Sequence, residues 1–165
     1  MPKFPWLSHL SVLMIASTSG SAATETSGEL PAEIVKLWPY HASLVIFGFL
    51  LLVWGMTVAR KKENGWLKKH RLLGISGAAV SVAGMTMAIY MIYAASQKHF
   101  RMPHAYLGSV VILLSIVTLD LGLLQLKASN KGKTKIRWVH RIFGRTALLL
   151  MALNMLFGML IVSSA

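Results

Sequence analysis

The sequence predicts an all-α integral membrane protein that folds as an antiparallel four-helix transmembrane bundle. Hydrophobic residues make up 55% of the 165 residues, the mean hydropathy is +0.61, and the apolar residues gather in four long stretches. At a rise of 1.5 Å per residue, each stretch is long enough to cross a hydrocarbon layer of about 30 Å. The four predicted spans run from Leu37 to Ala59, from Leu72 to Ala95, from His104 to Leu126 and from Ile142 to Ser163.

The residues before the first span predict a signal peptide over residues 1–23 and a flexible external lead-in over residues 24–36. Lys3 gives a positive start, Val12 to Ala16 form a short apolar stretch, and Ser21 to Ala23 form a small-residue cleavage signal. The alternative is an uncleaved arm, because the apolar stretch is short and only one basic residue precedes it. The lead-in is polar in either case, which is typical of a flexible segment.

The placement of charge predicts how the membrane domain over residues 37–165 is oriented. The net charge is +12, and 13 of the 17 Lys and Arg residues lie between the first two spans, between the last two, or just inside the fourth. Cytoplasmic loops accumulate Lys and Arg, so we expect both loops inside and the N-terminus outside a bacterial-type inner membrane. This placement favours membrane lipid over nucleic acid as the partner of the basic residues.

Four of the six histidines stand at the start of four different predicted spans. They are His41, His70, His104 and His140. Because the spans alternate in direction, His41 and His104 share the outer level, while His70 and His140 share the inner level. In an up-down bundle the first and third helices, or the second and fourth, can face each other across a diagonal of roughly 11–14 Å. That gap suits two imidazoles with an iron between them.

Small residues follow each histidine on the same helical face. They are Gly48, Gly55 and Ala59 after His41; Gly74, Gly77, Ser81 and Gly84 after His70; Gly108, Ser115, Thr118 and Gly122 after His104; and Gly144, Ala147, Asn154 and Gly158 after His140. Such a stripe leaves space for the edge of a porphyrin, but it also permits close packing of helices. Four ionisable side chains at matched depths favour the cofactor, because intramembrane ionisable residues are costly and usually functional.

Haem fits this pattern better than a bare metal ion does. Zinc generally takes four protein ligands, and the spans contain only one acidic residue, Asp120. The chain has no cysteine, which excludes iron–sulfur ligation and covalent c-type attachment. A porphyrin supplies four nitrogens, and two trans histidines complete the iron coordination, which favours electron transfer. The sequence therefore predicts two b haems, with the four histidines as axial ligands of the iron.

Charged residues near the inner histidines are further candidates for cofactor binding. Arg71, Arg141 and Arg145 stand where haem propionates or an anionic donor would need cationic partners, although they also follow the charge rule for cytoplasmic loops. Asp120 lies about 24 Å along its helix from His104. We consider it either a proton acceptor or an acid held by a nearby lysine or hydroxyl group.

These residues together resemble the four-helix haem-binding core of the cytochrome b561 family, over about residues 38 to 162. The motifs are His41-Ala-Ser-Leu, Trp66-Leu-Lys-Lys-His70-Arg71, His104-Ala-Tyr-Leu-Gly108 and His140-Arg141-Ile-Phe-Gly144-Arg145. The resemblance implies two b haems, ligated by the first with the third histidine and the second with the fourth. In eukaryotic relatives electrons commonly pass from ascorbate inside to monodehydroascorbate or ferric iron outside. The common form of the family has six helices, so its substrate sites do not transfer directly to a chain with four.

We therefore expect an oxidoreductase that moves electrons from a cytoplasmic-side donor to an external acceptor, each a small molecule or a protein. An ascorbate-type or ferric reductase fits this description. One alternative is a quinol-linked cytochrome b subunit of a larger redox complex, and another is a haem-free helical scaffold or transporter. For the assembly of the chain, the sequence allows either a homodimer or a subunit of a redox complex.

Overall fold

The computed structural model describes residues 31–95 and 102–164, and these ranges contain four α-helices and no strand. The helices are α1 (Ala32–Lys61), α2 (Trp66–Ala95), α3 (Pro103–Lys127) and α4 (Asn130–Ser163). Each is long and apolar enough to cross a membrane. The chain is a multi-pass membrane protein, and the fold class predicted from the sequence is confirmed.

The helices extend beyond the apolar spans that the sequence outlined. Helix α1 begins at Ala32, so it includes residues 32–36, the last five residues of the lead-in predicted for residues 24–36. Glu33 in the first turn favours this start, because a carboxylate interacts well with the positive end of a helix dipole. The predicted signal peptide and the rest of the lead-in lie outside the described residues.

Helix α4 differs most from the prediction, because it begins at Asn130 while the predicted span begins at Ile142. Its first turns are rich in Lys and Arg, which are good helix formers but do not count as apolar. Between α1 and α2 the chain turns sharply, with Lys62 (φ 53°) and Gly65 (φ 73°) in the left-handed region. A left-handed residue directly after a helix is a common way to end it.

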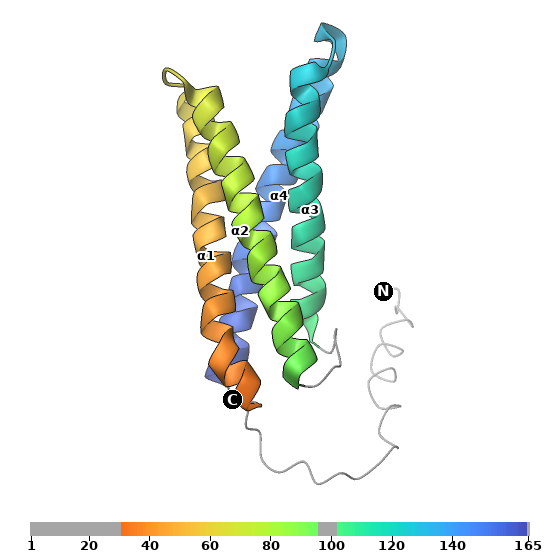
Figure 1. Ribbon diagram of the computed structural model, residues 1–165. Helices are drawn as coiled ribbons and strands as arrows, with labels where there is room; N and C mark the ends of the chain where they lie inside the picture. Colours follow the sequence, from red (N-terminus) through yellow and green to blue (C-terminus); the bar gives the residue numbers. More distant parts are fainter. Residues whose placement is uncertain (1–30, 96–101, 165) are drawn as a thin grey trace, which may run out of the picture.

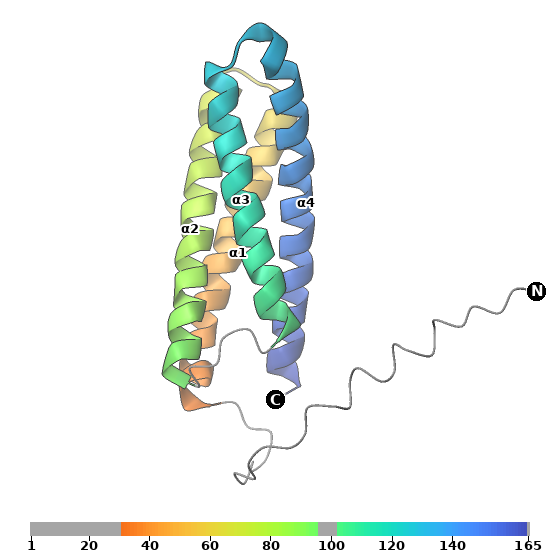
Figure 2. The ribbon, with the colours of Figure 1, turned by 90° about the vertical axis from the view of Figure 1, so that its right-hand side faces the viewer.

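The four helices form two antiparallel hairpins (Figure 1). Helix α1 packs along α2, and α3 packs along α4, whereas α2 touches α3 and α1 touches α4 at far fewer residues. Figure 2 looks along the diagonal from α3 to α1, with α2 and α4 on either side. The diagonal helices do not pack directly on each other within the described residues, so any group between them would be bordered by both hairpins.

Glycines draw α1 and α2 together. A Cβ atom at Gly77 would lie 2.8 Å from Leu52 Cγ and 3.0 Å from the carbonyl oxygen of Gly48. A Cβ atom at Gly48 would collide with the hydroxyl of Ser81, whose side chain is buried. The backbones of this hairpin are therefore in close contact, as in small-xxx-small packing of membrane helices.

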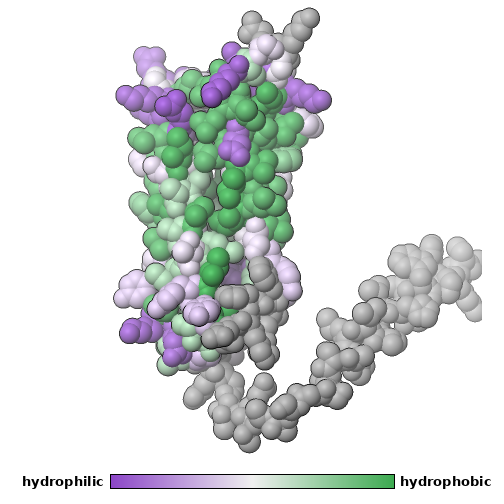
Figure 3. All heavy atoms as spheres, turned by 45° about the vertical axis from the view of Figure 1, so that its right-hand side comes forward, coloured by the Kyte–Doolittle hydropathy of each residue, from purple (hydrophilic) through white to green (hydrophobic). Residues whose placement is uncertain are grey.

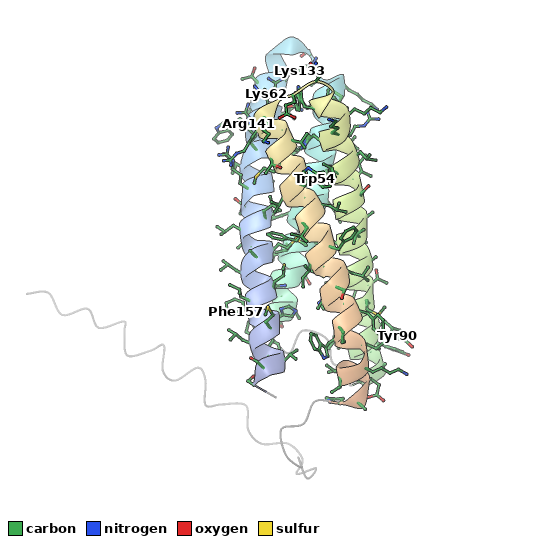
Figure 4. All side chains as sticks on the ribbon, turned by 90° about the vertical axis from the view of Figure 1, so that its left-hand side faces the viewer. Trp54, Lys62, Tyr90, Lys133, Arg141 and Phe157 are labelled. Carbon is green, nitrogen blue, oxygen red and sulfur yellow. The ribbon has the colours of Figure 1, made fainter. Side chains whose placement is uncertain are left out.

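Polar residues gather at the two ends of the bundle, on either side of an apolar band (Figure 3). Lys62, Lys133 and Arg141 lie at the end where α1 joins α2 and α3 joins α4, whereas Tyr90 lies toward the other end (Figure 4). We call the first of these the basic end, defined by residues 60–71 and 127–141. Both basic connections thus lie on the same side of the apolar band.

Candidate functional site

The four histidines meet in two pairs, and each pair joins one helix of each hairpin. The ring centroids of His41 on α1 and His104 on α3 are 6.3 Å apart, with ring planes at 88°. Those of His70 on α2 and His140 on α4 are 6.0 Å apart, with ring planes at 86°. These are the partners that helix order and direction predicted. We call the first the outer pair and the second the inner pair, which lies nearer the basic end.

Each histidine is oriented by a main-chain carbonyl on the other helix of its own hairpin. The Nδ1 atoms donate to Gly84 O (from His41, 2.8 Å), Gly55 O (from His70, 2.9 Å), Asn154 O (from His104, 3.0 Å) and Thr118 O (from His140, 2.9 Å). A carbonyl oxygen can only accept, so Nδ1 carries the proton and Nε2 keeps a free lone pair. Metal-bound histidines are usually fixed by this kind of bond.

The four acceptor residues share one spacing in the sequence. Each lies fourteen residues after the histidine of its own helix: Gly55 after His41, Gly84 after His70, Thr118 after His104 and Asn154 after His140. Fourteen residues of α-helix span about 21 Å. Every helix therefore supplies a histidine at one level and a carbonyl at the other, and the two pairs lie about 21 Å apart along the bundle.

In the second hairpin, glycines make space for the histidine rings. A Cβ atom at Gly158 would lie 2.9 Å from Cε1 of His104, and one at Gly122 would lie 3.2 Å from Cε1 of His140. Gly108 and Gly144 make space for Asn154 and Thr118 in the same way, at 3.1 and 3.3 Å from the nearest side-chain atom. In this hairpin, Gly122 and Gly158 allow a histidine ring to lie close to the backbone of the neighbouring helix.

The small-residue stripes therefore have more than one role. Gly84 belongs to a stripe predicted to leave space for a porphyrin, but its Cβ position faces Val45 Cγ2 at 2.8 Å and Leu44 Cβ at 3.3 Å on α1. It contributes to helix packing, and its carbonyl orients His41. Gly74 has no such neighbour within 4 Å. It remains the candidate for bordering a cofactor at the inner pair.

The geometry of the pairs fits a metal ion held between two imidazoles. With metal–nitrogen bonds of about 2.0–2.1 Å and a ring centroid about 1.1 Å from Nε2, two trans imidazoles have centroids roughly 6.2–6.4 Å apart. The observed 6.3 Å of the outer pair lies within this range, and the 6.0 Å of the inner pair lies slightly below it. Within the described ranges, no group of three or more His, Cys, Asp or Glu side chains could hold a bare ion. The donor set therefore fits an iron whose other ligands come from a porphyrin.

The charged candidates lie around the inner pair and not between its rings. Arg71, Arg141 and Arg145 are all exposed. Arg145 follows His140 by five residues, which turns it about 140° around the helix from that histidine. Asp120 is exposed as well, on α3. For each of these charged side chains, the sequence had indicated only an approximate depth in the membrane.

Sequence reasoning missed the carbonyl acceptors, because a main-chain group carries no residue-type signal. The repeated spacing of fourteen residues could have indicated them only once the hairpin partners were known. Trp66 was noted as part of a sequence motif, and its ring centroid lies 6.4 Å from that of His70. Its indole therefore also borders the inner pair.

Comparison with known protein families shows a likeness over most of the chain. The family model described as eukaryotic cytochrome b561 matches residues 40–163, which include all four paired histidines and most of both hairpins. No curated protein and no solved structure matches the chain.

Proposed function

The chain belongs to the cytochrome b561 family of haem b-binding transmembrane electron-transfer proteins, and from this premise we propose that it carries two b haems in series across the membrane. The observation that carries the proposal is that the four histidines face each other in two pairs, one at each level of the bundle. Each of the four imidazoles donates its Nδ1 proton to a main-chain carbonyl, which leaves the lone pair of Nε2 available to a metal. Two donors at matched spacing on each level are what a bis-histidine haem needs.

His41 and His104 would hold the outer haem, and His70 and His140 the inner one. The carbonyl bonds fix the rotation of each ring and make its free nitrogen a stronger donor. A six-coordinate b haem, when bound, supplies one-electron transfer without an open coordination position. The residues of the two hairpins keep each imidazole in place on both sides of the site.

The charge asymmetry supports the orientation in the membrane that we propose, and with it a donor inside and an acceptor outside. We place the basic end inside, because cytoplasmic loops accumulate Lys and Arg, and the N-terminus of α1 outside. The 21 Å between the levels covers most of the hydrocarbon thickness of about 30 Å. Exposed Arg71, Arg141 and Arg145 provide cationic hydrogen-bond donors near the inner pair for propionates or for an anionic donor. The acceptor is reached from the outer pair.

Haem content is the decisive measurement. Purified protein is expected to show sharp b-type bands on reduction and two haems per chain, both released by acid extraction because the chain has no cysteine. Colourless, well-folded protein from haem-replete cells would contradict the proposal. A saturating value of one haem per chain would remove the transmembrane route. Reduction of an external acceptor by liposomes loaded with a reductant tests the direction.

A further inference from the structure

Asp120 lies in a crevice on the outward face of α3. The crevice has a volume of about 340 Å³ and is lined by Asp120, Leu123, Leu124 and Lys127. Leu123 and Leu124 are 41% and 54% exposed. Asp120 follows His104 by sixteen residues, so it points about 160° away from that histidine and toward the lipid. Within the described ranges, Asp120 forms no hydrogen bond or ion pair.

The crevice lies at the depth of the inner pair. Thr118 and Gly122, two residues before and two residues after Asp120, both contact His140. Thr118 O accepts the His140 Nδ1 proton at 2.9 Å, and the Cβ position of Gly122 lies 3.2 Å from His140 Cε1. The carboxylate and the imidazole thus occupy opposite sides of the same turns of α3. Only the width of one helix separates the crevice from the inner pair.

We propose that this crevice binds the headgroup of a lipid-dissolved quinol, which donates electrons to the inner site. This inference rests on the proposed function, because it needs the inner histidine pair to hold a one-electron acceptor. A quinol ring carries one oxygen at each end, and the crevice offers a carboxylate at one end and an ammonium group at the other. The two leucines provide apolar contact for the ring, and the open side lets an isoprenoid tail remain in the lipid.

The carboxylate has a chemical role in this reaction. Oxidation of a quinol to a quinone breaks two O–H bonds and releases two protons and two electrons. The irons that the two histidine pairs would hold could each take up one of the two electrons. Asp120 accepts the protons one at a time and returns each to water at the basic end, where Lys127 ends α3. An intramembrane carboxylate that faces lipid is costly, and proton transfer is a common reason for one.

A second copy of the chain fits the crevice less well than a quinol does. In a two-fold dimer with both copies inserted in the same direction, two α3 helices would run parallel and place Asp120 beside its own equivalent. In such a dimer, equivalent residues lie at the same depth. Lys127 lies about 10 Å further along the helix, so it would not reach the Asp120 of the other copy. Like charges would then meet within the membrane, which opposes this contact.

The test uses the purified holoprotein and a photoreactive azidoquinone as the probe. Labelling is expected on the α3 peptide that contains Leu123 and Leu124, and it should be lost in Asp120→Leu. Asp120→Asn keeps a polar group of the same shape, so it should still be labelled. Decylubiquinol should reduce that variant about 10²-fold more slowly or worse, the usual contribution of a positioned proton acceptor. Dithionite should reduce every variant normally.

Leu113→Asn is the matched control, because Leu113 is 63% exposed two turns away on the same face of α3. It should leave labelling and quinol-driven reduction unchanged. Labelling elsewhere, or normal labelling and reduction in Asp120→Leu, would overturn the inference. So would a change of oligomeric state in Asp120→Leu without any labelling of the unaltered protein. Protein that binds two haems but is not labelled would contradict this inference alone. Protein that is labelled but binds no haem would contradict the proposed function.

Discussion

The two hairpins orient their histidines with the same main-chain bond but place their glycines differently. In the α1–α2 hairpin, glycines stand seven and fourteen residues after each histidine and bring the two backbones together. In the α3–α4 hairpin, they stand four and eighteen residues after each histidine and leave space for rings and side chains. The carbonyl acceptor is the feature that both hairpins share. Local packing can vary as long as that acceptor stays in position.

This difference predicts that damage to the first hairpin is general, whereas damage to the second is specific to one site. Close backbone contact supports α1 and α2 along their length, so a disturbance there weakens both levels. Contact between α3 and α4 is less extensive, and the glycines of this hairpin lie against the histidines and the residues that orient them. Four predictions test this contrast.

The largest effect is expected from loss of a ligand. His104→Ala should abolish the same haem as His41→Ala, and His140→Ala the same haem as His70→Ala, leaving about one haem per chain in each case. The remaining haem should stay reducible, since the levels lie about 21 Å apart. Low-temperature spectra and haem quantification measure this. The diagonal pairing would be wrong if His41→Ala and His70→Ala removed the same component.

A substitution in the second hairpin should affect one haem only. In Gly158→Ala the new methyl group would lie 2.9 Å from His104 Cε1, where the ring is held by its bond to Asn154 O. We expect haem retention at the outer site to fall about 10- to 100-fold, as for other disturbances of groups behind a metal ligand. Gly132→Ala, whose nearest contact is 3.9 Å, is the control and should bind both haems. Equal loss of both haems would argue against the contrast.

A substitution in the first hairpin should instead lower general stability. In Gly48→Ala the methyl group collides with Ser81 Oγ and approaches the backbone of α2 at 3.0 Å. Overpacking of this kind costs about 1–3 kcal/mol, so folded yield should fall with the ratio of the two haems unchanged. Adding Ser81→Ala removes the colliding hydroxyl and should recover part of the yield. Selective loss of one haem would show that this hairpin, too, acts locally.

The smallest effect is expected at Asn154. Its backbone carbonyl orients His104, but within the described residues its buried Oδ1 has no hydrogen-bond partner. A buried unpaired acceptor costs about 1–3 kcal/mol, so Asn154→Leu should be neutral or slightly stabilising and keep both haems. Thermal loss of the haem bands measures this change. A selective loss of the outer haem would mean that the amide itself contributes to that site.

The sequence predicted the number of helices, their alternation in direction and which histidines share a level, because hydropathy and the order of the helices report these features directly. Helix ends were less accurate, since a helix that leaves the lipid keeps its hydrogen bonds but loses its apolar signal; the early start of α4 is the clearest case. The roles of Gly84 and Gly158 could not be separated from the sequence. Helix contact, ring clearance and space for a porphyrin all require the same small residue.

The position of the carbonyl acceptors also has a consequence for biosynthesis. Every histidine finds its acceptor within its own hairpin, so α1 and α2 can orient His41 and His70 before the ribosome has made α3. One half of each site is then ready when the second hairpin is inserted, and the incoming hairpin supplies the other half already oriented. The two hairpins, co-expressed as separate chains, are therefore expected to recover haem binding that neither shows alone, with haem content as the readout.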